Sequence, residues 1–109
     1  MAKHEFGIMK GDPVKGRRYD DYEPQKYDCI SIDDKYIERI DSELMTLKCY
    51  AHTLDAPIDG LAYCGITLIP PDSIKQFISL IESQAEMNDL KKLLCEALKK
   101  NRFVIHFGL

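Results

Sequence analysis

Apolar residues recur at intervals of three and four positions in three stretches of the chain. This spacing predicts amphipathic helices over 34–45, 72–84 and 88–100. Asp33 suits the N-cap of the first helix, because an aspartate side chain accepts hydrogen bonds from the free backbone N–H groups of a first turn. Asn101 suits the left-handed residue that ends the last helix.

Runs of β-branched, aromatic and aliphatic residues predict strands elsewhere, and three of these runs are short: 5–9, 27–32 and 103–107. Two longer runs, over 47–54 and 61–69, predict a β-hairpin. The residues between them include a proline and a glycine, which favour a turn because proline fixes its φ and glycine accepts a positive one.

Alternate residues of a strand point to opposite faces, so a symmetric hairpin has two distinct faces and places His52 opposite Tyr63. The small, apolar face is expected to pack under the helices and carries Leu47, Cys49, Ala51, Thr53, Ala62, Cys64, Ile66 and Leu68. The aromatic and polar face is expected to be open and carries Lys48, Tyr50, His52, Leu54, Leu61, Tyr63, Gly65 and Thr67. A slip of one residue would exchange the faces of one strand relative to the other.

The order strand, strand, helix, hairpin, helix, helix, strand predicts an α+β fold. We expect one domain over 1–109, built on a mixed, mainly antiparallel sheet of about five strands with three helices mostly on one face. The pattern leaves the strand order open.

A long charged segment, KGDPVKGRRYDDYEPQK over 10–26, separates the first two predicted strands. Its tyrosines argue against disorder, so we expect an ordered loop, called the 10–26 loop below. Arg17 and Arg18 stand beside Tyr19 and Tyr22, and arginine and tyrosine are enriched where proteins bind proteins. The alternative is that the charges pair locally and the tyrosines fix the loop to the body of the protein.

The net charge of -3 and the sequence pI of about 5.6 exclude a broad electrostatic attraction to nucleic acid or to an anionic membrane. The sequence contains no apolar run long enough to cross a bilayer. Its first residues lack the apolar segment of a signal peptide, so we expect a cytoplasmic protein.

The four cysteines, Cys29, Cys49, Cys64 and Cys95, form no CxxC pair, and their spacing matches no zinc pattern. The last three fall on predicted core faces, which leaves Cys29 as the expected most accessible thiol. A disulfide is not expected in a reducing compartment. We therefore expect neither a bound metal nor a cofactor.

His52 is the main candidate for chemistry, because its neighbours on the open face are Tyr50, Tyr63 and Thr67. A histidine beside tyrosines can act as acid, base or ligand-binding donor, although a half-exposed strand histidine bonded to a neighbour has the same pattern. His106 joins this group if the last strand lies beside the hairpin. The sequence lacks a glycine-rich phosphate loop, GxSxG, HExxH and a Rossmann fingerprint.

The segments HTLDAPIDGLAYCGITLIPPDSI and FVIHFGL resemble a family of small bacterial proteins of about this length that has no known activity. The likeness covers most of the chain and implies no role for any residue. The segment GITLIPPDSI, a strand followed by two prolines and a helix, is also similar to part of some small bacterial immunity-type proteins, over about ten residues.

These observations favour a binding protein that uses the aromatic and polar sheet face and the 10–26 loop to contact another protein or a second copy of itself. The predicted binding residues are Tyr50, His52, Tyr63, Thr67, Arg17, Arg18, Tyr19, Tyr22 and His106. One alternative is a small hydrolase or isomerase that uses His52 with Tyr50 or Tyr63. Another is a homo-oligomeric structural protein.

Overall fold

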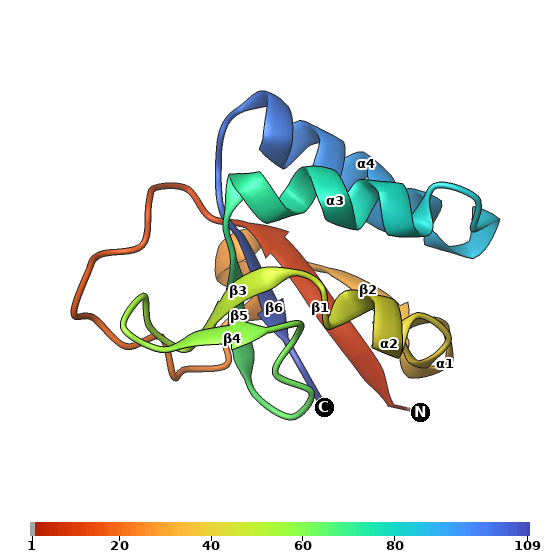
Figure 1. Ribbon diagram of the computed structural model, residues 1–109. Coiled ribbons are helices and arrows are strands. Elements are labelled where there is room, and N and C mark those ends of the chain that lie inside the picture. Colours follow the sequence, from red (N-terminus) through yellow and green to blue (C-terminus); the bar gives the residue numbers. More distant parts are fainter. Residues whose placement is uncertain (1) are drawn as a thin grey trace.

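The computed structural model describes residues 2–109, and its centre is one antiparallel sheet (Figure 1). Within that range the sheet has six strands: β1 (Lys3–Ile8), β2 (Ile30–Asp33), β3 (Lys48–Ala51), β4 (Pro57–Asp59), β5 (Ile66–Ile69) and β6 (Val104–Phe107). Their spatial order is β2-β1-β6-β5-β3-β4, and each described neighbouring pair is antiparallel. The predicted α+β class is confirmed, and the sheet has one strand more than expected.

The helices gather on one side of this sheet. They are α1 (Asp34–Glu38), α2 (Asp41–Leu44), α3 (Pro71–Ile81) and α4 (Asn88–Lys99), with the 3₁₀ turn η2 (Ala85–Met87) before α4. The other 3₁₀ turn, η1 (Pro24–Tyr27), places Tyr27 against the opposite face. Figure 1 shows α3 and α4 together over one face and α1 and α2 beside one end. The first predicted helix is thus two short ones, and Asp33 caps α1 as predicted, accepting from the Lys35 N–H at 3.0 Å. Over residues 2–109, no helix has both the length and the hydropathy needed to cross a bilayer.

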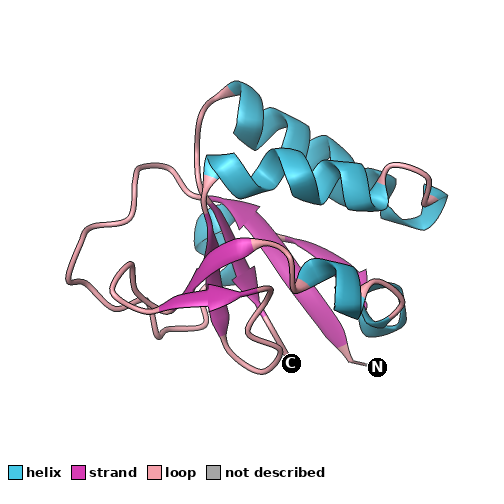
Figure 2. Cartoon of the chain, viewed as in Figure 1, coloured by secondary structure: helices cyan, strands magenta, loops and turns pink. Residues whose placement is uncertain are grey.

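Both faces of the sheet are buried. On one face Phe6 and Val104 pack against Phe77 and other apolar residues of α3 and α4. On the other face lies a second apolar cluster of Met9, Ile66, Leu68, Ile105 and Phe107, with Tyr19 and Tyr27 packed against it. Figure 2 shows the long loop that carries Tyr19. The face predicted to be open is therefore largely covered by this loop.

The predicted hairpin register is wrong. β3 pairs with β5 through Tyr50↔Leu68 and Ala51↔Thr67, and the added strand β4 pairs with the other edge of β3. The expected register would place Gly65 opposite Tyr50, so β5 is shifted by three residues relative to it. An odd shift exchanges the faces of the strand, so Thr67 lies on the helix side and its neighbours Ile66 and Leu68 lie on the other side. The prediction failed because it assumed a symmetric closure, whereas residues 52–65 contain β4 and positive φ angles at His52 and Gly60.

Candidate functional site

A cleft of about 590 Å³ lies on the loop side of the sheet, where β1 begins and β6 ends. We call it the His52 cleft. Its walls come from the 10–26 loop, from β1, from the connection between β4 and β5, and from the end of β6, through residues that include Asp20, Tyr22, Lys3, Glu5, Cys64 and Phe107. This volume falls in the usual range for small-molecule and cofactor sites, roughly 300–1,000 Å³.

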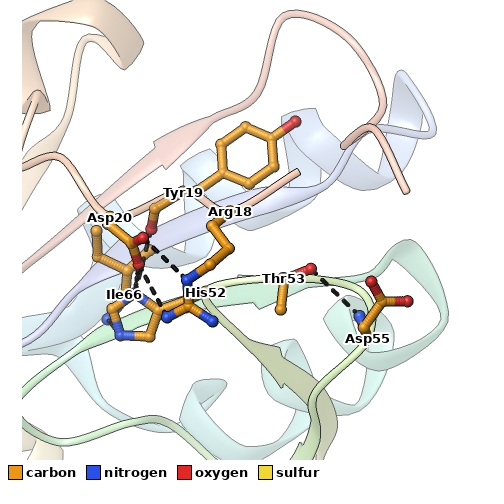
Figure 3. A network of polar contacts seen from close by, with 7 residues as sticks. All are labelled: Arg18, Tyr19, Asp20, His52, Thr53, Asp55 and Ile66. Atoms are coloured by element: carbon orange, nitrogen blue, oxygen red, sulfur yellow. Dashed lines mark hydrogen bonds and ion pairs between the residues drawn. The ribbon is translucent and has the colours of Figure 1, made fainter. Parts of the chain in front are cut away.

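His52 is held in the cleft by contacts to both of its ring nitrogens (Figure 3). Its Nδ1 lies 2.8 Å from Oδ1 of Asp20 and 3.2 Å from the carbonyl oxygen of Tyr19. Its Nε2 accepts from the backbone N–H of Ile66 at 3.3 Å. These contacts indicate that the neutral imidazole carries its proton on Nδ1. The Nδ1–H group then donates to the 10–26 loop, and Nε2 faces β5.

The backbone of His52 is fixed as firmly as its ring. Its φ of 61° is left-handed, a conformation that costs a non-glycine residue about 1 kcal/mol or more. Two backbone hydrogen bonds hold it there: the Tyr19 N–H donates to the His52 carbonyl at 2.7 Å, and the His52 N–H donates to the Ile66 carbonyl at 3.0 Å. His52 therefore joins the 10–26 loop to the start of β5.

Asp20 carries the negative charge of this group. The Arg18 guanidinium donates to both of its carboxylate oxygens, at 3.0 and 3.2 Å. The Arg18 contact, followed by that of His52, holds the pKa of the Asp20 carboxyl below its ordinary value. Asp20 is therefore a carboxylate at neutral pH, and its main effect is to orient the imidazole, because exposed ion pairs add little stability.

The rim of the cleft is aromatic and exposed. The Tyr22 side chain is 62% exposed, and its ring lies edge-on against Phe107 with 5.4 Å between ring centroids. Its hydroxyl donates to the Glu5 carboxylate, and this contact raises the pKa of Tyr22. Ile66 and Phe107 are buried, so an apolar floor lies beneath an exposed aromatic ring.

Gly65 gives the His52 ring its space. A Cβ atom at this position would lie 2.9 Å from Nε2 of His52, closer than side chains pack. We expect Gly65→Ala to displace the imidazole and break its contact with the Ile66 N–H, with no effect on the helices. The histidine ring ¹⁵N shifts and the Ile66 amide signal report this directly. Gly11→Ala is the matched control, since a Cβ there meets nothing within 4 Å, and equal spectra for the two variants would contradict this account.

The structure does not bring all predicted binding residues together. Tyr22 and His52 line the cleft, while Arg18 and Tyr19 support it through Asp20 and the backbone. The Arg17 guanidinium lies 5.0 Å from the centre of the Tyr19 ring. This pairing inside the loop matches the alternative in which the charges pair locally.

The remaining predicted residues lie elsewhere, so the expectation that they share one open face with His52 is wrong. Tyr50 is half-buried against the second apolar cluster. Thr67 and His106 are fully buried on the helix side of the sheet, because β5 is shifted by three residues from the expected register and β6 pairs with it through Thr67↔His106. Tyr63 is 40% exposed but bonds to Asp34 of α1 instead of facing His52.

A chain of polar side chains on the helix side includes His4 and Asp34, which were not among the predicted binding residues. The ring of His106 lies 3.2 Å from the Thr67 hydroxyl and 2.8 Å from the ring of His4, and His4 lies 2.8 Å from the Asp34 carboxylate. The Tyr63 hydroxyl donates to that carboxylate at 2.6 Å. A sequence signal for His4 did exist, since it continues the alternation of Phe6 and Ile8 toward the N-terminus.

Burial and charge set the protonation of this chain. Burial, followed by the charge of His4, lowers the pKa of His106 to about 3. The Tyr63 hydroxyl, followed by His4, holds the pKa of Asp34 below its ordinary value, and Asp34 raises the pKa of Tyr63 to about 12. Asp34 is therefore an anion that accepts from two donors.

The cysteines differ from the expectation. Cys49 is buried as predicted, but Cys64 and Cys95 are exposed, and Cys29 is half-buried with its pKa raised to about 12 by burial. Cys64 is exposed because it lies outside β5, in the cleft wall. Among residues 2–109, the thiols are free and no group of three or more His, Cys, Asp or Glu side chains could hold a metal ion.

A smaller hollow of about 350 Å³ lies at the opposite end of the sheet, between β1 and the end of α4. It is lined by Met9, Lys10, Leu93, Lys100 and Arg102 among others, and Glu96 lies 3.9 Å from Lys100. It lacks the fixed histidine and the exposed aromatic rim of the His52 cleft. We therefore take the His52 cleft as the candidate site.

Compared with protein-family models, curated proteins and solved structures, the chain matches none of them significantly.

Proposed function

We propose that this protein works by binding, and that its His52 cleft takes an extended segment of a protein partner. One observation carries the proposal: a cleft with a buried apolar floor and an exposed aromatic rim lies beside a histidine fixed by five backbone and side-chain contacts. Tyrosines that combine a rigid ring with a polar tip are typical of the residues that dominate protein–protein binding energy.

The charged side chains of the cleft indicate which residues the bound segment should carry. The Glu5 carboxylate already accepts from the Tyr22 hydroxyl. The Asp20 carboxylate is already bonded to Arg18 and His52. Lys3 lines the cleft and forms no ion pair with a described residue. A segment that places an apolar side chain over Phe107 and a carboxylate near Lys3 fits this arrangement, since an opposite charge is the natural partner of an unpaired cation.

We expect a library of random peptides displayed on phage to yield binders rich in apolar and acidic residues. Tyr22→Ala should weaken their binding about tenfold or more, because truncation of a central aromatic costs roughly 1.4 kcal/mol or more. Met45→Ala is the control, since Met45 is a similarly exposed apolar residue, 55% exposed, outside the cleft. Isothermal titration of the selected peptides gives the comparison.

Two results would count against the proposal. Peptides whose affinity falls equally in the Tyr22 and Met45 variants would show that the cleft is not their site. A library that yields no binder at all would argue against peptide recognition by this chain.

One observation favours an enzyme as the second candidate. A histidine oriented by a carboxylate in a cleft is the arrangement of a general base, here His52 with Asp20 at 2.8 Å. However, the nitrogen that would take a proton already accepts from the Ile66 N–H. Hydrolysis of p-nitrophenyl esters by the wild type and by His52→Ala separates the candidates, and equal rates would remove His52 from any such mechanism.

A further inference from the structure

We propose that three buried side chains, Thr67, His106 and His4, form a hydrogen-bonded anchor for residues 62–65 together with the partly exposed Asp34, and that uptake of one proton by the two histidines loosens this segment. Residues 64 and 65 are part of one wall of the His52 cleft. The inference rests on the proposed function only in that this wall belongs to the binding site.

The hydrogen-bonded chain begins and ends on the same short segment. At one end the backbone N–H of Ala62 donates to the Thr67 hydroxyl oxygen at 2.8 Å. At the other end the hydroxyl of Tyr63, the next residue, donates to Asp34. The network is therefore a closed ring, and both side-chain anchors of the segment belong to it.

When both histidines are neutral, the hydrogen bonds of this network run in one direction. Because the Asp34 anion accepts from Nε2–H of His4, the Nδ1 of His4 is an acceptor and receives Nε2–H of His106. The Nδ1 of His106 then accepts from the Thr67 hydroxyl, which leaves the oxygen of that hydroxyl free to accept from Ala62. Each buried donor on this path has an acceptor.

One added proton reverses this path. The proton binds Nδ1 of His4, which becomes a cation beside the Asp34 carboxylate and now donates to Nε2 of His106. The proton of His106 leaves Nε2 for Nδ1 and is donated to the Thr67 oxygen. That oxygen then receives N–H groups from both His106 and Ala62, and the Thr67 hydrogen loses its acceptor in a fully buried site. An unsatisfied buried donor is costly, so the bond to Ala62 becomes the weak point of the ring.

The groups that face the two imidazoles limit the pair to one proton. They are the Asp34 carboxylate of α1, the Tyr63 phenol at an interplanar angle of 67° to His4, and the imidazoles themselves. Glu38 and Asp41 act on Tyr63 from α1 and α2. From the packed helices, Phe77 of α3 reaches Phe6, whose ring lies 4.9 Å from that of His106. The available counter-charge lies on the His4 side, which favours a single cation there.

Amide hydrogen exchange and histidine ¹⁵N spectra test this anchor on the full chain without any ligand. The exchange rate of the Ala62 amide is compared with that of Leu94, inside α4, so that global opening and the intrinsic pH dependence cancel. We expect the rate of Ala62 relative to Leu94 to rise about tenfold between neutral pH and about pH 5, while His106 changes tautomer. Thr67→Val should expose the Ala62 amide at every pH, and Thr53→Val, at the other buried threonine, should behave as the wild type.

A constant ratio across this range would overturn the proposal. So would histidine spectra in which proton uptake leaves the tautomer of His106 unchanged, or loss of protection at Ala62 and Leu94 together. Because no ligand is present, failure here leaves peptide binding at the cleft standing, and failure of the peptide selection leaves this anchor standing.

Discussion

Replacing His106 with leucine is expected to lower the free energy of unfolding by about 2–4 kcal/mol, although leucine is apolar and the site is fully buried. The loss does not come from the imidazole itself. It comes from the two partners that remain, Nδ1 of His4 and the Thr67 hydroxyl, which lie 2.8 and 3.2 Å from the ring in the native protein. Urea unfolding followed by circular dichroism gives the value.

The same reasoning predicts that the effects of two substitutions are not additive. His4→Leu alone should destabilise the protein for the same reason, because it leaves the buried Nε2–H group of His106 without an acceptor. The double variant, His4→Leu with His106→Leu, removes donor and acceptor together and should recover about 0.5–3 kcal/mol relative to the sum of the single changes. Strict additivity would show that the two rings do not share a hydrogen bond.

Acidification is expected to destabilise the wild type from about pH 6.5 downward. The pKa of His106 is near its ordinary value in the unfolded chain but is lowered to about 3 in the folded protein, first by burial and then by His4. Between these values His106 binds a proton in the unfolded chain but stays neutral in the folded protein. Stability is therefore complete above about pH 6.5 and falls with decreasing pH by up to about 1.4 kcal/mol per pH unit.

Urea unfolding of the wild type and of His106→Leu between about pH 7 and pH 4.5 tests this linkage. In this window the carboxyl groups of Asp20 and Asp34, whose pKa values are lowered, remain ionised and do not contribute. The leucine variant should show a shallower pH dependence by one proton. Parallel curves for the wild type and His106→Leu would contradict the assignment.

The sequence predicted what depends on local pattern. The apolar stripes placed α3 and α4 because helical periodicity is visible within a few turns, and Asp33 and Asn101 showed the predicted cap and left-handed stop. Tyr50 and His52 were placed correctly on the side of the sheet away from the helices, as was Cys49 on the opposite side.

The rest depends on long-range contacts. The side of the sheet on which Thr67 lies depends on the register of β5, which differs by three residues from the symmetric hairpin because the connection contains the left-handed His52 and the extra strand β4. The pairing of His4 with His106 joins positions 102 residues apart. No local sequence pattern predicts such a contact. Nor does a local pattern predict how the 10–26 loop packs to create the cleft.

The chain carries its own means of testing where a partner binds, because Cys64 lies in the cleft wall and Cys95 lies on α4, and both are exposed. Each is kept as the single cysteine, the others replaced by serine or alanine, and is labelled with a benzophenone maleimide. On illumination with a selected peptide, the account predicts a crosslink from Cys64 and none from Cys95. A peptide that crosslinks equally from both positions, or from Cys95 alone, would contradict the claim that the His52 cleft is the binding site.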